Sequence, residues 1–93
     1  MAEVKRYMQK DRYESIIQSV FMLSNHKIDK PLAIDGYDLM EYFRLYGHNP
    51  LKGETPGGEF ERWKKFLWDT EGISCIYDYE KNYYIFRKIK SSN

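Results

Sequence analysis

This sequence is poor in the residues that build disulfides and metal sites, with one cysteine, two histidines and no long apolar run. The single cysteine, Cys75, excludes a disulfide within the chain, and the lack of a disulfide framework is typical of a reducing cytosol. No apolar stretch approaches the roughly 20 residues of a membrane helix, and the N-terminus lacks the apolar segment of a signal peptide. The sequence therefore predicts a soluble cytoplasmic protein without membrane contact.

Catalytic, metal and cofactor motifs are also missing. His26 and His48 lie far apart, and neither has a nearby cysteine or second histidine that would complete a metal site. No Gly-Lys-Ser/Thr follows the glycines of the central loop, as a phosphate-binding loop would require. No base and orienting group mark Cys75 as a nucleophile, so we interpret it as a packed core thiol. We expect a protein that is not an enzyme and holds no metal or cofactor.

The composition that remains is that of one folded domain. Hydrophobic residues make up 42% and aromatic residues 17% of 93 residues, which favours a packed core over disorder. The net charge is only +1, although residues 1–10 and residues 73–93 each carry a net charge of +2. We expect an N-terminal arm or short helix at residues 1–10, a single domain at 11–90 and a polar tail at 91–93.

Apolar spacing predicts two helices in the first half of the chain. The first starts near Asp11, which forms a capping-box pattern with Glu14, and ends at Asn25 and His26. Its apolar face comprises Tyr13, Ile16, Ile17, Val20, Phe21 and Ser24. Residues 31–35 are either a short strand or an extended linker. Asp35 then caps a second helix that ends at Gly47, with an apolar stripe of Leu39, Met40, Phe43 and Tyr46.

A long loop, residues 48–58, leads to a third helix and a hairpin. Thr55 and Pro56 are suited to cap that helix, and Gly72 ends it. Its buried stripe is predicted to be Phe60, Trp63, Phe66 and Leu67. Residues 73–79 and 83–89 are predicted strands joined by a three-residue turn with Asn82 in the left-handed position. That turn would pair Tyr79 with Tyr83, Tyr77 with Ile85 and Ile76 with Phe86.

This order of helix, short strand, helix, helix and hairpin resembles a winged helix-turn-helix domain of the α+β class. The resemblance covers about residues 11–90 and lies in the order of elements. It implies a DNA-binding protein, such as a regulator, whose third helix enters the major groove while the hairpin acts as a wing on the backbone. The residues it assigns to DNA contact are Arg62, Lys64, Lys65, Lys81, Arg87 and Lys88.

The outward face of the third helix points to an alternative, because Glu61 and Asp69 lie beside its cations. A helix that contacts phosphates normally avoids carboxylates, so a protein-interaction module, either an adaptor or an inhibitor, is the alternative function. Its contact candidates are Trp68, Tyr77, Tyr79, Tyr83 and Tyr84. The hairpin tyrosines would equally serve cross-strand packing, and exposed aromatics would also suit a homodimer. This size and composition are also common among small phage and mobile-element proteins.

Overall fold

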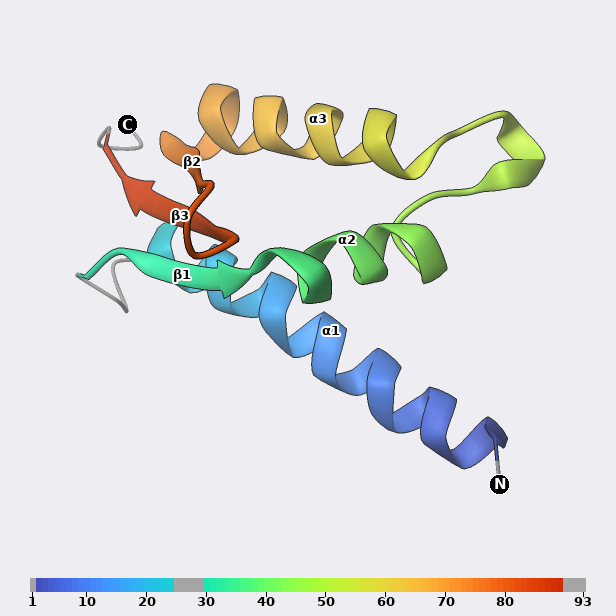
Figure 1. Ribbon diagram of the computed structural model, residues 1–93. Coiled ribbons are helices and arrows are strands. Elements are labelled where there is room, and N and C mark those ends of the chain that lie inside the picture. The colour runs from blue at the N-terminus through green and yellow to red at the C-terminus, as the bar shows by residue number, and fades with distance from the viewer. Residues whose placement is uncertain (1, 25–29, 90–93) are drawn as a thin grey trace.

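Three helices and a three-stranded antiparallel sheet make up the described chain (Figure 1), as predicted for the α+β class. The computed structural model describes the backbone of residues 2–24 and 30–89 and the side chains of residues 10–23 and 30–89. The elements in chain order are α1 (Ala2–Ser24), β1 (Leu32–Asp35), α2 (Gly36–Leu45), the 3-10 turn η1 (Pro50–Lys52), α3 (Pro56–Phe66), the π-helical turn η2 (Leu67–Glu71), β2 (Ile73–Asp78) and β3 (Tyr83–Lys88).

The sheet has the order β1-β3-β2, so the last strand lies in the centre. β1 pairs antiparallel with β3, with Leu32 opposite Phe86 and Ile34 opposite Tyr84. The segment that was expected to be a short strand or a linker is therefore a strand. The pairing joins the first third of the chain to its C-terminal hairpin, and the arrangement is compatible with a winged-helix-like fold.

Helix α1 begins at Ala2, not near Asp11, so residues 2–10 continue the helix and Asp11 does not cap it. An ion pair between Lys10 and Glu14, 3.9 Å apart, spans the expected boundary at the i, i+4 spacing that supports a helix. Figure 1 shows the N-terminal turns of α1 (blue) extending beyond α2 and α3. The rest of α1 packs against α2 and β3.

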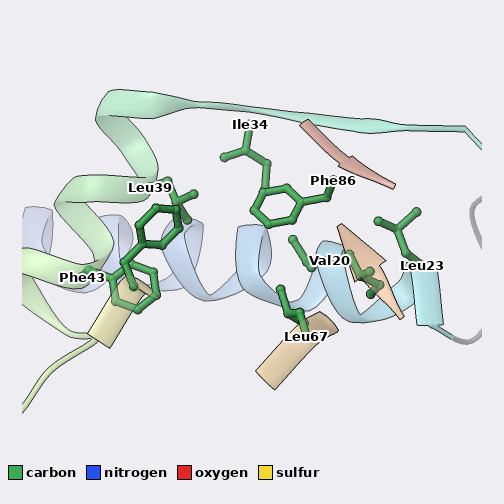
Figure 2. Packing of buried hydrophobic residues seen from close by; sticks show 9 residues of the cluster. Val20, Leu23, Ile34, Leu39, Phe43, Leu67 and Phe86 are labelled. Atoms are coloured by element: carbon green, nitrogen blue, oxygen red, sulfur yellow. The ribbon is translucent and has the colours of Figure 1, made fainter. Parts of the chain in front are cut away.

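Each helix and strand contributes to one hydrophobic core. Its buried members are Val20 and Leu23 of α1, Ile34 of β1, Leu39 and Phe43 of α2, Phe60 of α3, Leu67 of η2, Ile73 of β2 and Phe86 of β3. Figure 2 shows side chains from the helices and the sheet converging on Phe86. The predicted apolar stripes supply most of this core, and Leu23 is an addition to them.

Phe66 is the main error in those stripes, because 46% of its surface stays exposed. It lies at the edge of the apolar face of α3, where it lines a shallow groove with Ile17, Tyr42 and Trp63. The backbone widens into the π-helical turn directly after Phe66, and Leu67, the next residue, is fully buried. Leu67 therefore fills the core position at the end of this helix.

The predicted helix ends are mostly confirmed. The Asp35 carboxylate accepts the N–H of Tyr37 at 2.8 Å, and the Thr55 hydroxyl accepts the N–H of Gly58 at 3.1 Å. Gly72 ends the α3–η2 segment in the left-handed conformation, with φ 67°. Gly47 does not adopt that conformation, so its predicted role as a left-handed stop is wrong.

Gly47 is required for space instead. A Cβ atom on Gly47 would lie 2.6 Å from Cδ1 of Phe43, which is closer than packed carbon atoms approach one another. His48 follows, and its Nδ1 lies 2.6 Å from the carbonyl oxygen of Phe43. This partly buried hydrogen bond ties His48 to the end of α2.

The hairpin is one residue out of the predicted register. β2 and β3 are joined by a four-residue turn, residues 79–82, which places Asp78 opposite Tyr83, Tyr77 opposite Tyr84 and Cys75 opposite Phe86. The predicted pairs Tyr79–Tyr83, Tyr77–Ile85 and Ile76–Phe86 are therefore wrong. The Asp78 carboxylate stabilises the longer turn by accepting the N–H groups of Glu80 at 3.0 Å and Lys81 at 3.2 Å.

Asn82 closes this turn and docks it on the start of α2. Its φ of 56° confirms the predicted left-handed position. The Asn82 carbonyl oxygen accepts the N–H of Gly36 at 2.8 Å, and its side-chain oxygen accepts the Tyr77 hydroxyl at 2.6 Å. A Cβ atom on Gly36 would lie 2.4 Å from that side-chain oxygen, so any larger residue here would have to displace Asn82.

We predict that Gly36→Ala lowers the free energy of unfolding by about 1–3 kcal/mol, because the added methyl group must displace Asn82. Gly57→Ala is the matched control: nothing lies within 4 Å of its added Cβ, and alanine suits a helix, so stability should stay level or rise. Urea unfolding monitored by circular dichroism measures both. Equal stability of Gly36→Ala and the wild type would contradict the tight docking of Asn82.

Candidate functional site

The cations that α3 was predicted to present to DNA are already paired with carboxylates. Arg62 lies 3.4 Å from Glu59, Lys64 lies 2.8 Å from Glu61, and Lys65 lies 2.7 Å from Asp69. The segment from Pro56 to Glu71 holds four carboxylates and three cations. Exposed ion pairs contribute at most about 1 kcal/mol to stability, so they can break when a ligand binds. Even then, the carboxylates would remain close to any phosphate that the helix contacted and would repel it. This helix face is therefore close to neutral and unsuited to a phosphate backbone.

Further interactions hold the two lysines of α3, Lys64 and Lys65, close to the helix. The pKa of Lys65 is raised, first by its hydrogen bond to Asp69 and then by the charge of that carboxylate. Lys64 also lies 4.7 Å from the centre of the Phe60 ring, in cation–π distance. Both ammonium groups are thus held close to the surface of α3.

The hairpin cations divide into two kinds. Lys88 lies on the core side of β3 and its ammonium donates to the backbone carbonyl of Glu71, so it ties the hairpin to η2. Lys81 and Arg87 are exposed and form no ion pair within the described part of the chain. Of the six predicted DNA contacts, these two alone present a cation without a described partner. His26 and the basic side chains of residues 1–9 and 90 lie outside the described residues.

The tyrosines also divide by the face of the sheet. Tyr77 and Tyr84 lie on the core side, with ring centres 4.7 Å apart, and Tyr84 packs edge-on against Phe60 at 5.0 Å. Burial is the main cause of the raised pKa of Tyr84. These two tyrosines serve packing. Tyr79 at the turn and Tyr83 on the opposite face are 86% and 37% exposed, so both are available for contact.

The second face of the sheet is uncovered by any described element. Alternation along the strands places on it Ala33 of β1, Tyr83, Ile85 and Arg87 of β3, and Ser74 and Ile76 of β2; we call this set the outer sheet face. Ile76 is 64% exposed, whereas Phe86 on the core side is fully buried. The outer sheet face was not predicted as a unit, because the one-residue error in register gave Ile76 the wrong partner.

A groove with a volume of about 470 Å³ runs between α3, η2 and β2. Trp68, one of the predicted contact candidates, is partly exposed and lines the groove together with Ile73 and Cys75. Cys75 is half-buried against the core, which confirms the packed thiol. Burial raises the pKa of Cys75 to about 11, while the nearby Lys64 lowers it and Glu61 raises it. The thiol is therefore protonated at neutral pH.

No family model, no curated protein and no solved structure matches this chain. Among residues 2–24 and 30–89, no helix is both long and apolar enough to cross a membrane. Within the same residues, no three His, Cys, Asp or Glu side chains gather as a metal ion would require. The interaction surfaces themselves are the basis for a functional assignment.

We predict that Cys75 reacts slowly with iodoacetamide near pH 8 and that its rate rises steeply only as the pH approaches about 11. The same reaction in guanidinium chloride should follow an ordinary thiol pKa of about 8.5, because unfolding removes the burial. Mass spectrometry of samples quenched over time measures both rates. A folded protein that is alkylated at neutral pH as fast as the unfolded chain would contradict the packed position of Cys75.

Proposed function

We propose that this chain is a non-enzymatic protein-interaction module of winged-helix type, which contacts its partner through the outer sheet face. The observation that carries this proposal is the contrast between two surfaces. The cations of α3 are neutralised by neighbouring carboxylates, whereas apolar side chains of the sheet lie open to solvent.

The apolar part of the outer sheet face is continuous. Ile76 lies directly opposite Ile85 across the hairpin, and Ile85 lies opposite Ala33 of β1. Tyr83 adjoins this row and is partly exposed, with a polar hydroxyl and an apolar ring of the kind enriched at binding hot spots. Covering apolar surface contributes about 25 cal/mol per Å², so a partner that covers this row gains stability without contacting a phosphate.

DNA binding is the second candidate, and the topology favours it. The order β1-β3-β2 with a hairpin following α3 is the arrangement in which a wing accompanies a recognition helix. Lys81 at the turn and Arg87 on the outer sheet face would provide the phosphate contacts. Two cations give a weak electrostatic contribution, because DNA-binding proteins commonly neutralise about 6–10 phosphates.

We predict that the protein, immobilised at high density, retains one partner protein from a concentrated, nuclease-treated lysate of its native cells. Ile76→Lys should reduce this capture about tenfold or more, because a lysine ammonium would lose its hydration at the contact. Leu51→Lys is the matched control: Leu51 is 95% exposed in η1, away from the sheet, so capture should not change. Quantitative mass spectrometry of the bound fraction measures both effects.

Fluorescence anisotropy with duplex DNA tests the second candidate, DNA binding. Salt-dependent binding near physiological ionic strength that disappears when Lys81 and Arg87 are both replaced by glutamate would contradict the proposal and support the second candidate. Binding that is equally weak for the wild type and for this double variant is the result expected of a protein-interaction module.

A further inference from the structure

The outer sheet face carries its charges in a polarised pattern. Its central row is apolar and consists of Ile76, Ile85 and Ala33. Arg87 lies two residues from Ile85 in one direction along β3, and Tyr83 lies two residues away in the other. At a rise of about 3.4 Å per residue, both are about 7 Å from the central row. The cation is thus at one end of the face.

Two carboxylates lie at the opposite end. Register places Asp78 of β2 and Asp35 of β1 on either side of Tyr83. Each carboxylate caps a backbone segment through Oδ1, which accepts N–H groups at the hairpin turn and at the start of α2 respectively. Their positions are therefore fixed by the fold. The face has an apolar middle, a positive end and a negative end.

We infer that the outer sheet face binds a second copy of this chain in a two-fold dimer, an inference that rests on the proposed function by naming its partner. A two-fold axis along the central row reverses the strand direction and turns the second sheet to face the first. Ile76 then lies over Ile76 of the other copy, and Ile85 over its counterpart. Arg87 lies over Tyr83, between Asp35 and Asp78 of the other copy.

The distances suit such a contact. Stacked sheets lie about 10 Å apart and aligned sheets cross at about 30°, so the apolar rows touch while the longer arginine side chain reaches the opposite negative end. The guanidinium group can bind a carboxylate and lie over the Tyr83 ring at the same time. The two-fold axis makes both ends of the interface equivalent, so two such contacts form for each dimer.

The charges of this face also favour a second copy of the chain over a nucleic acid or an unrelated protein. A nucleic acid backbone on this face would meet Asp35 and Asp78, against Arg87 on the face and Lys81 at the hairpin turn. An unrelated protein would need to bring both charges in the complementary order, whereas a second copy does so by symmetry. The sheet is small compared with the interfaces of stable dimers, so we expect a weak association that depends on concentration.

Sedimentation equilibrium over protein concentrations from about 10 µM to about 1 mM tests this inference. We expect the wild type to shift from monomer to dimer in this range, and Ile76→Lys to raise the dimer Kd about tenfold or more, since it sets two ammonium groups against each other. Leu51→Lys should dimerise like the wild type. Thermal unfolding identifies any variant that is unfolded.

Arg87→Glu provides an independent test through charge. It should also weaken the dimer about tenfold or more and remove the loss of association that salt causes in the wild type, because the complementary pairs are gone. A wild type that stays monomeric at about 1 mM, or a dimer whose Kd neither Ile76→Lys nor Arg87→Glu changes, would overturn the inference. Capture of a different protein that depends on Ile76, from a chain that stays monomeric, would overturn the dimer while the proposed function stands.

Discussion

The contact between Asn82 and Gly36 is the constraint on which the arrangement of the sheet depends. The backbone carbonyl of Asn82 accepts a hydrogen bond from the first N–H of α2 at 2.8 Å, and its side-chain oxygen accepts one from the Tyr77 hydroxyl at 2.6 Å. One residue therefore connects the turn of the hairpin, the strand β2 and the junction of β1 with α2. Because Gly36 has no Cβ, the turn can lie directly on this junction, and β1 is brought into register with β3.

This register decides which side chains face the core and which face outward. With Tyr77 opposite Tyr84, both rings lie on the core side, where Tyr84 packs against Phe60, while Ile76 and Ile85 lie on the outer sheet face. Lys88 also turns inward and ties β3 to η2. The paired charges of α3 and the exposed apolar row of the sheet are the two features from which we propose a protein-interaction module.

The sequence predicts the fold well wherever a signal is local. Apolar spacing, the caps Asp35 and Thr55, and the turn residue Asn82 lead to the correct class and to nearly all elements. The errors have tertiary causes. The length of the hairpin turn depends on the Asp78 carboxylate and on docking against Gly36, so the register cannot be derived from alternation alone. Likewise, the pairing of Lys88 with Glu71 arises only after the chain folds, and the outer sheet face follows only from the correct register.

Nuclear Overhauser spectroscopy of the hairpin can test whether Asn82 fixes the register of the sheet against α2. We expect strong cross-peaks between the rings of Tyr77 and Tyr84, whose centres lie 4.7 Å apart, and between backbone protons of Asn82 and the Gly36 amide. Cross-peaks that pair Tyr77 with Ile85, together with no contact between Asn82 and Gly36, would contradict this expectation.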